Sequence, residues 1–220
     1  MYSRPDILFW DVDTQIDFIH ADGKLSVPDA EAIVPNLERL TDAARRNGIP
    51  VVQSADDHEP EDGEISEDPD LESTYPPHCM RGTEGRERIP ETRLTEVVTI
   101  GHRGMTDGEI RRLVADAPHA VLILKKRFDV FSNPNAAKVV SAIEPRKIVL
   151  YGVALDVCDR AALEGLWKRG YTDLALVTDA VKALDPERGE ELLAQWRQRG
   201  VEMLTTDEVL ARVEEPVPAE

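Results

Sequence analysis

The chain has 220 residues, 41% of them hydrophobic, which fits one α/β domain over residues 1–220 with a sizeable core. Its 43 acidic and 26 basic residues give a formal net charge of −17, which disfavours nucleic acid as a partner because phosphate binding requires clustered lysine and arginine. Two cysteines are too few for a disulfide scaffold. No apolar stretch is long enough to cross a membrane, and residues 1–6 lack the features of a signal peptide. We therefore expect a cytoplasmic protein without a membrane partner.

Short apolar runs alternate with amphipathic segments along the chain. The runs are nearly continuous, as is typical of parallel strands buried on both faces. They cover residues 7–12, 50–54, 97–100, 120–124, 148–153 and 174–177. Apolar residues recur at helical spacing over residues 33–44, before Gly48, and over residues 161–167, before Gly170. This order predicts a doubly wound, mostly parallel sheet of about six strands with helices on both faces, a Rossmann-like three-layer fold.

Two segments lack this periodicity. Residues 63–90 are acidic and rich in proline, and a loop of that length in a compact domain is usually either functional or disordered. Residues 214–220 are expected to form a frayed acidic tail. Neither segment divides the chain into two domains.

Polar residues follow several of the predicted strands. In open parallel sheets, ligands bind beyond the carboxyl ends of the strands, so these residues are candidates for a site. The residues at the strand ends are Asp11 and Asp13, Asp56 and His58, Lys125 and Lys126, and Cys158. A carboxylate, a lysine and a cysteine from separate strands would therefore meet at one edge of the sheet.

Cys158 lies where a predicted strand turns into a helix. The N-terminus of a helix stabilises a thiolate, and its free amides can bind an oxyanion. Asp13 is placed to accept the thiol proton as a general base, and Lys125 is placed to balance the charge. Taken singly, each residue also has a structural interpretation: a buried small hydrophobe, a turn cap and a solvated lysine.

Asp56 and His58 suggest a metal site. Residues two apart on an extended segment face the same way, so both side chains can reach one ion, while Glu64 and His78 would have to fold back from the long loop. Imidazole and carboxylate ligands suit zinc, iron or manganese better than calcium. Alone, the pattern also fits two surface histidines near acidic residues.

Five motifs occur in one order along the chain. They are D-x-Q-x-D-F at residues 13–18, S-x-D-x-H at 54–58, P-P-H-C-x-x-G-T-x-G at 76–85, K-x-x-F-D-x-F at 125–131 and G-V-A-x-D-x-C at 152–158. Together they resemble the isochorismatase-like cysteine hydrolases, and most closely the nicotinamidases. The resemblance covers most of the chain.

The resemblance implies a catalytic triad of Asp13, Lys125 and Cys158. Cys158 would attack an amide carbonyl, Asp13 would pass the thiol proton to the leaving ammonia, and Lys125 would orient and stabilise the charges. Water would then hydrolyse the thioester. The resemblance also implies a cis peptide bond between Val153 and Ala154, with the amides of Ala154 and Cys158 forming the oxyanion hole.

The nicotinamidases also bind a divalent metal ion beside the triad. Their ligands carry over to Asp56, His58 and His78, with Glu64 as the matching fourth ligand. We expect zinc, with iron or manganese as alternatives, and the ion would hold the pyridine nitrogen of the substrate. Phe18 and Tyr75 would sandwich the ring, although many relatives carry tryptophan at the position of Tyr75. The isochorismatases themselves lack this metal set, and their chemistry does not need the cysteine.

The function predicted from these residues is metal-dependent hydrolysis of nicotinamide, or a similar small aromatic amide, to the acid and ammonia. A second hypothesis keeps the triad but acts on carbamoyl or ureido groups, and a third is a catalytically silent binding protein. Lys126 competes with Lys125 for the catalytic position, and we prefer Lys125 for its spacing to Phe128 and Phe131. Family members commonly form dimers or tetramers, so we expect a homo-oligomer, although the helices carrying Trp167 and Trp196 fit better as covers of the sheet. We assign no role to Cys79.

Overall fold

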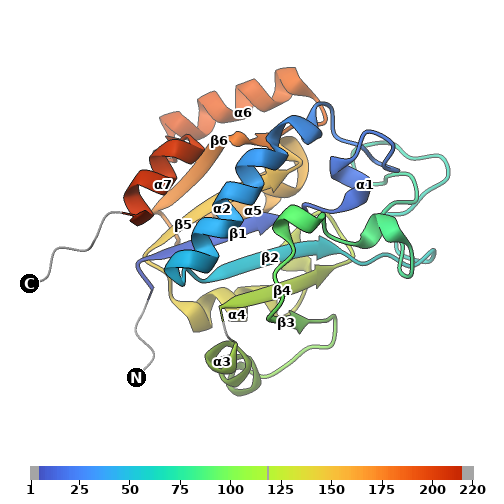
Figure 1. The fold of residues 1–220 in the computed structure, drawn as a ribbon. Coiled ribbons are helices and arrows are strands. Elements are labelled where there is room, and N and C mark those ends of the chain that lie inside the picture. Colours follow the sequence, from blue (N-terminus) through green and yellow to red (C-terminus); the bar gives the residue numbers. More distant parts are fainter. Residues whose placement is uncertain (1–4, 118, 215–220) are drawn as a thin grey trace, which may run out of the picture.

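The computed structural model describes residues 5–117 and 119–214, and a single sheet of seven strands runs through its centre. The strand order is β3-β4-β2-β1-β5-β6-β7, and every pair of neighbours is parallel (Figure 1). The strands are β1 (Ile7–Val12), β2 (Val51–Asp56), β3 (Val97–Ile100), β4 (Ala120–Lys125), β5 (Lys147–Val153), β6 (Leu174–Lys182) and β7 (Glu202–Leu204). The parallel α/β fold is confirmed.

The predicted count of about six strands was wrong because it missed β7. This edge strand has three residues, of which only Leu204 is buried, so it forms no continuous apolar run. Strand β2 also extends two residues beyond its predicted end. All of its residues are buried, including the polar Ser54 and Asp56, because other polar groups surround its carboxyl end. This extension carries Ser54 and Asp56 into the candidate site.

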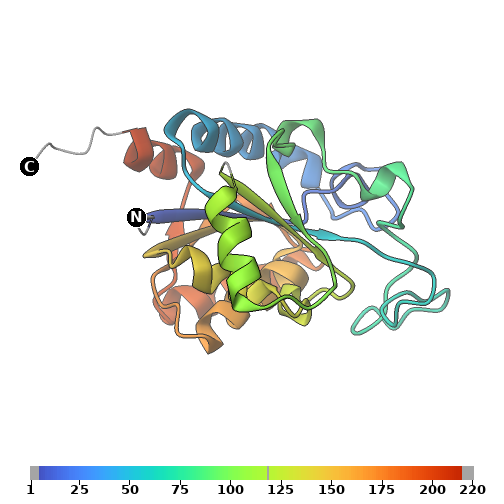
Figure 2. The same ribbon diagram turned by 90° about the horizontal axis from the view of Figure 1, so that it is seen from below.

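Helices cover both faces of the sheet. The α-helices are α1 (Ile16–Ile19), α2 (Val34–Asn47), α3 (Asp107–Asp116), α4 (Ala136–Ile143), α5 (Arg160–Lys168), α6 (Pro186–Gln198) and α7 (Thr206–Glu214). Short helical turns are η1 (Ala30–Ile33), η2 (Glu84–Arg86), η3 (Pro90–Thr92), η4 (Val130–Ser132) and η5 (Leu155–Asp159), the last a turn of π-helix. Helices α2 and α7 lie on one side and α3 to α6 on the other (Figure 2), each side with its own apolar cluster.

The two predicted helices begin and end close to their expected positions. Helix α2 ends at Gly48, whose φ of 63° is the left-handed conformation that favours glycine. Trp196 is buried between α6 and the sheet, whereas Trp167 is half-buried and lies under the guanidinium of Arg199, 3.8 Å from the ring centroid. Trp196 thus serves as a cover of the sheet.

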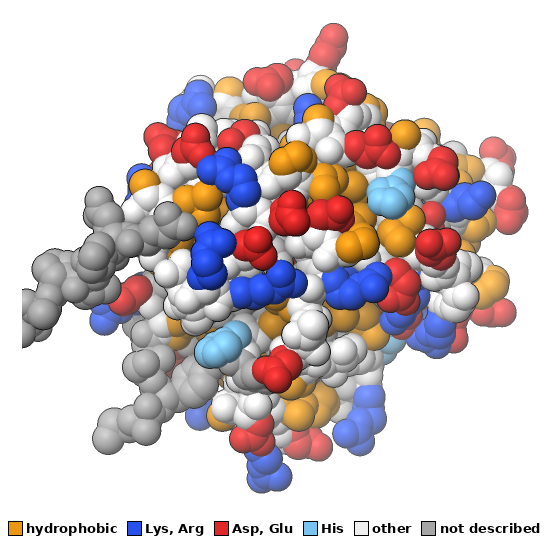
Figure 3. All heavy atoms as spheres, viewed as in Figure 1, with side chains coloured by type: hydrophobic (Ala, Val, Ile, Leu, Met, Phe, Trp, Pro, Cys, Tyr) orange, Lys and Arg blue, Asp and Glu red, His pale blue; other side chains and the backbone are white. Residues whose placement is uncertain are grey.

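The surface over α2 carries acidic and basic side chains next to one another, with hydrophobic side chains scattered among them (Figure 3). Within the described residues, no helix has the length and apolar character needed to cross a membrane. The predicted tail lies outside the described residues from residue 215 onward.

The long loop over residues 63–90 has a defined path. Single β-bridges join Ile65 to Tyr75, His58 to Met80 and Gln15 to Arg88. They fold the loop back over the carboxyl ends of β1 and β2. The loop therefore returns Glu64 and His78 to the strand ends, as the metal prediction required.

Candidate active site

Four strand ends bring a lysine, two aspartates and a cysteine together. The amino group of Lys125, at the end of β4, lies 2.9 Å from Oδ2 of Asp13, 2.6 Å from Oδ1 of Asp56 and 3.7 Å from Sγ of Cys158. A carboxylate oxygen of Asp13 and the sulfur of Cys158 are within 4.8 Å of each other. All four side chains are buried. The structure thus joins the three residues of the predicted triad around one ammonium group.

Lys126 points away from this group. Its side chain is 30% exposed, and its amino group lies 2.7 Å from Glu59 and 2.8 Å from Asp62. Successive residues of a strand face opposite sides, so only one of the two lysines can reach the cluster. The structure places Lys125 there, in agreement with the preference drawn from its spacing to the phenylalanines.

The environment of Cys158 favours the neutral form of its thiol. Burial raises the pKa of the Cys158 thiol well above its usual value, and the carboxylates of Asp13 and Asp56 raise it further against the opposing charge of Lys125. Stabilisation of the thiolate by the helix N-terminus stays a prediction. Desolvation opposes the helix dipole because Cys158 is only 7% exposed.

Asp13 is suited to accept a proton. Burial raises the pKa of its carboxyl group above the usual value, although Lys125 opposes that shift, and a higher pKa makes a carboxylate a stronger base. The hydroxyl of Ser54 donates a hydrogen bond of 2.7 Å to Oδ1 of Asp13. A neutral thiol beside a basic carboxylate favours transfer of the proton during attack rather than a preformed ion pair.

The turn that carries Cys158 begins where β5 approaches β1 closely. At Gly152, an added Cβ would lie 2.0 Å from the carbonyl oxygen of Val12, so only glycine fits. The peptide bond between Val153 and Ala154 is cis, as the resemblance implied. Residues 155–159 then form η5, which leads into α5. The part of the Ala154 and Cys158 amides in an oxyanion hole stays a prediction.

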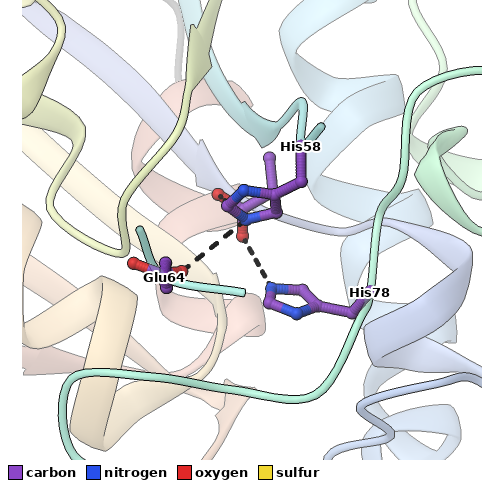
Figure 4. Close-up of side chains that lie close together, drawn as sticks. His58, Glu64 and His78 are labelled. Atoms are coloured by element: carbon purple, nitrogen blue, oxygen red, sulfur yellow. Dashed lines mark ion pairs between the residues drawn. The ribbon is translucent and has the colours of Figure 1, made fainter. Parts of the chain in front are cut away.

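Asp56, His58, Glu64 and His78 lie together beside the triad. Nε2 of His58 is 3.6 Å from both Asp56 Oδ1 and Glu64 Oε1, and Nε2 of His78 is 3.6 Å from Asp56 Oδ2. Figure 4 shows His58, Glu64 and His78 directed toward a common point. Ligand atoms about 2.0–2.1 Å from a tetrahedral zinc are roughly 3.3 Å apart, close to the spacing observed here.

The hydrogen bonding of the two histidines fits a bound divalent cation. Neither ring nitrogen of the buried His58 has a hydrogen-bond partner, which is costly unless another group binds there. Nδ1 of His78 donates to the carbonyl oxygen of Pro76 at 2.7 Å, so its Nε2 is left as an acceptor facing Asp56. Metal-binding histidines typically donate their second ring nitrogen in this way. The donor set therefore fits the ion that the sequence analysis predicted.

The first motif also holds the metal ligands in place. The side-chain amide of Gln15 pairs with the backbone of Asp56, donating to its carbonyl oxygen at 2.9 Å and accepting from its N–H at 2.7 Å. The carboxylate of Asp17 accepts from the backbone N–H of Cys79, next to His78, at 2.7 Å. An added Cβ at Gly85 would lie 2.2 Å from that carboxylate. These residues lie within the quoted motifs, but no role was predicted for Gln15 or Asp17.

A cavity of about 20 Å³ lies above Cys158. Phe18 and Tyr75 line it as predicted from the resemblance, and burial raises the pKa of the Tyr75 phenol to about 12, so that side chain is neutral. A set of apolar wall residues was not predicted, because no feature of the sequence separates them from the core. They are Leu25, Val27, Val157 and Leu184; Phe128, quoted only within a motif, also lines the cavity. Within the described residues, no lysine or arginine lines this cavity.

Asp159, next to the candidate nucleophile, is a buried carboxyl group that sequence analysis also missed. Neither of its oxygens has a hydrogen-bond partner, and burial raises its pKa well above the usual value. Between the unfolded value of about 4 and the folded value, the folded protein binds more protons, so stability falls as pH rises. Asparagine has nearly the same shape as a neutral aspartic acid side chain and does not titrate, so Asp159→Asn removes this loss of stability at high pH.

We therefore expect Asp159→Asn to be more stable than the wild type at pH 8, with a difference that grows by up to about 1.4 kcal/mol per pH unit between the two pKa values. Urea denaturation of both proteins from pH 5 to pH 8 measures this difference. Other titrating groups are shared by the two proteins and cancel. A constant difference across that range would show that Asp159 is ionised in the folded protein.

The chain is similar to known proteins over nearly its whole length. The isochorismatase domain matches residues 8–208. The structure of a Pyrococcus horikoshii pyrazinamidase in complex with zinc is 25% identical, with a TM-score of 0.71 over 91% of this chain and 99% of that one. An N-carbamoylsarcosine amidase from Thermoplasma acidophilum is 26% identical, with a TM-score of 0.69 over 92% and 97%. The Arabidopsis thaliana protein named "Probable inactive nicotinamidase" is 25% identical over 199 residues, 90% of this chain and 91% of that protein.

Proposed function

The chain belongs to the isochorismatase family, and from this we propose that it is a metal-dependent amidase that converts nicotinamide, or a similar small aromatic amide, to the acid and ammonia. One observation carries the proposal. Cys158, Asp13 and Lys125 meet beside a four-residue metal-ligand group. Cys158 and three of those ligands, Asp56, Glu64 and His78, line the same cavity. A nucleophile, its base and a site for an ion are thus within reach of one small substrate.

In the proposed reaction, Asp13 takes the thiol proton of Cys158 as the sulfur attacks the amide carbon. The carbonyl oxygen becomes an oxyanion directed at the backbone amides of Ala154 and Cys158. Asp13 then returns the proton to the amide nitrogen as the C–N bond breaks, and ammonia leaves a thioester on Cys158. Water attacks the thioester, Asp13 accepts a proton from that water, and the acid leaves with the thiol restored. Lys125 keeps Asp13 ionised between these steps.

Asp56, His58, Glu64 and His78 would hold the ion, and zinc is the metal we propose, with iron and manganese as alternatives. The zinc in the pyrazinamidase of Pyrococcus horikoshii supports this choice. Bound there, the ion would supply a fixed positive charge that binds a ring nitrogen of the substrate.

The lining of the cavity favours a neutral, flat substrate. Phe18, Tyr75 and Phe128 offer aromatic surfaces, and the remaining wall is aliphatic apart from the metal ligands and Cys158. An N-carbamoyl amino acid carries a carboxylate, which would need a cationic side chain in the lining. Because the chain is similar to the carbamoylsarcosine amidase, hydrolysis of carbamoyl groups is the second candidate function. The name of the Arabidopsis thaliana protein makes a catalytically silent binding protein the third candidate.

Ammonia release by the zinc-loaded protein tests the proposal. We expect release from nicotinamide and none from N-carbamoylsarcosine. Chelation is expected to lower the rate by about 100-fold, because loss of substrate orientation costs about that factor, and added zinc should restore it. Metal content, measured before and after chelation, verifies that the ion was removed.

The three candidate functions give different results in this assay. Release from N-carbamoylsarcosine alone would move the assignment to the carbamoyl class. Release from neither compound by protein with stoichiometric zinc would contradict nicotinamide as the substrate. If Cys158 in that protein also failed to react with small amides in general, the silent protein would be the better description.

A further inference from the structure

The cavity above Cys158 is too small for the proposed substrate in the conformation seen here. Its volume of about 20 Å³ holds roughly one water molecule. An aromatic ring with a carboxamide group is several times larger. The side chains that form the mouth of the cavity, and how firmly each is held, therefore control which substrates fit.

The walls differ in how firmly they are held. Phe18 and Tyr75 are buried, with exposed fractions of 6% and 4%. The mouth is formed instead by half-buried apolar side chains. They are Leu25, Phe128, Val157 and Leu184. Movement at the mouth exposes less apolar surface to water than movement of the buried aromatic residues, so the mouth is the cheaper place to open.

Leu184 is fastened directly to the turn that carries the nucleophile. It lies between the end of β6 and the start of α6, and its backbone N–H donates to Oδ1 of Asp156 at 2.9 Å. The N–H of Asp185 donates to Oδ2 of the same carboxylate, also at 2.9 Å. Asp156 lies in η5, between Ala154 and Cys158. One carboxylate therefore sets the position of Leu184 relative to the reactive sulfur.

The residues next to Leu184 have little freedom to move. At Gly189, in the first turns of α6, an added Cβ would lie 2.8 Å from Cβ of Ala183 and 3.4 Å from a methyl carbon of Leu155. The start of α6 is thus packed tightly against η5. Leu25 differs, because its N–H donates to the carbonyl oxygen of Asp17, in α1, at 3.1 Å and not to the nucleophile turn. Leu184 thus belongs to the segment between β6 and α6, and its hydrogen bond to Asp156 fixes the position of its backbone relative to the turn that carries Cys158.

We propose that Leu184 sets the size of the amide that reaches Cys158 and that Asp156 is the positioning residue that holds Leu184 in place. The inference rests on the proposed function only in taking the Cys158 sulfur as the atom that a substrate must reach. Substitution at Leu184 changes the space over the sulfur and leaves the triad and the metal ligands intact. Substitution at Asp156 weakens the hydrogen bonds that hold the backbone of Leu184 and Asp185, so this wall of the cavity is held less firmly.

Alkylation of Cys158 measures this space without knowledge of the substrate. Zinc-loaded protein is treated with iodoacetamide and, separately, with the bulkier N-phenyl iodoacetamide, and mass spectrometry follows labelling at Cys158 apart from the buried Cys79. The quantity compared is the ratio of the bulky rate to the small rate. We expect Leu184→Ala to raise this ratio about tenfold or more, because one methylene of room in an apolar pocket changes selectivity by roughly 10–200-fold. Leu184→Phe should lower it.

Leu25→Ala is the matched control, at a mouth residue that is not bonded to the nucleophile turn, and we expect a smaller rise in the ratio. Leu71→Ala, at an exposed leucine, should leave it unchanged. An unchanged ratio in Leu184→Ala, or an equal rise in Leu25→Ala, would overturn the role of Leu184. If that ratio changes as expected but nicotinamide is not hydrolysed, the inference stands and the proposed function fails.

Asp156→Asn keeps one acceptor oxygen but places an amide NH₂ against the second backbone N–H, so it weakens the attachment of Leu184. We expect it to raise the ratio in the same direction as Leu184→Ala and to leave the rate with iodoacetamide within about twofold. Equal falls in both rates would mean that Asp156 acts on the nucleophile turn itself, which would overturn its role as the residue that positions Leu184.

Discussion

Cys158→Ala is expected to lower ammonia release from nicotinamide on the order of 10⁴-fold or more, the loss typical when a covalent nucleophile is removed from a catalytic triad. The folded structure should be retained. The sulfur of Cys158 makes only a long contact of 3.7 Å with Lys125, and alanine fits the same buried site. Single-turnover measurement with wild-type protein should show the thioester as an acylated Cys158, which the variant cannot form.

The second cysteine is a matched control for this prediction. Cys79 is fully buried, and its sulfur contacts the carbonyl oxygen of Gly85 at 3.8 Å. The hydrogen bond that links this residue to Asp17 comes from its backbone N–H, which Cys79→Ala keeps. We expect Cys79→Ala to retain activity within a few-fold. Full turnover by Cys158→Ala would exclude a covalent mechanism and point to direct attack by water.

Most of the fold could be predicted from the pattern of apolar residues along the sequence. Strands buried on both faces have to be apolar along their whole length, and six of the seven strands lie at runs of that kind. The seventh, β7, pairs only with β6 at an edge and needs one buried side chain, so nothing in its composition separates it from a loop. The extension of β2 to Asp56 was missed for a related reason. Its last residues are buried by polar partners rather than by apolar ones.

The candidate site could be predicted where topology alone brings residues together. Parallel strands end at one edge, so Asp13, Asp56, Lys125 and Cys158 had to lie near one another once the strands were known. The return of His78 to that edge could be inferred only from the resemblance, because a long loop has no periodic pattern.

Other features of the site depend on packing that a sequence does not display. In the sequence Leu184 is an ordinary apolar residue of a loop, and only the fold shows that Asp156 binds its backbone N–H and that it lines the same cavity as Cys158. The protonated state of Cys158 depends on how completely the fold excludes water, and the helix-end argument leaves that out. Aspartate is usually found at the protein surface, yet Asp159 is fully buried.

Lys125→Met is expected to destabilise the folded protein by about 3–5 kcal/mol at neutral pH, the usual cost of removing one partner from a buried ion pair. Lys125 is the cation between two buried carboxylates, Asp13 and Asp56. The pKa of Asp56 stands well below its usual value, since Lys125 and the histidines outweigh the opposing effect of burial, so this carboxylate contributes stability above its unfolded pKa of about 4. In the variant, burial without Lys125 raises the pKa of Asp13 further, so this carboxylate takes up a proton as the pH falls and part of the lost stability returns. The difference between wild type and variant should therefore be largest near pH 7 and shrink as the pH approaches 4. Urea denaturation of chelated protein at pH 5 and pH 7 measures it, with no bound cation to replace the missing charge.

The neighbouring lysine gives a control with the same chemistry in a different environment. Lys126 forms its ion pairs near the surface, with 30% of its side chain exposed, so Lys126→Met should cost only about 0.2–1 kcal/mol. The two variants should differ in activity as well. Without Lys125 the pKa of Asp13 rises further, and loss of a general base costs about 10²–10⁴-fold in rate, whereas Lys126→Met should keep most of the wild-type rate. Equal losses of stability in the two variants, or full turnover by Lys125→Met, would show that the buried ammonium group is dispensable and that Asp13 stays ionised through other contacts.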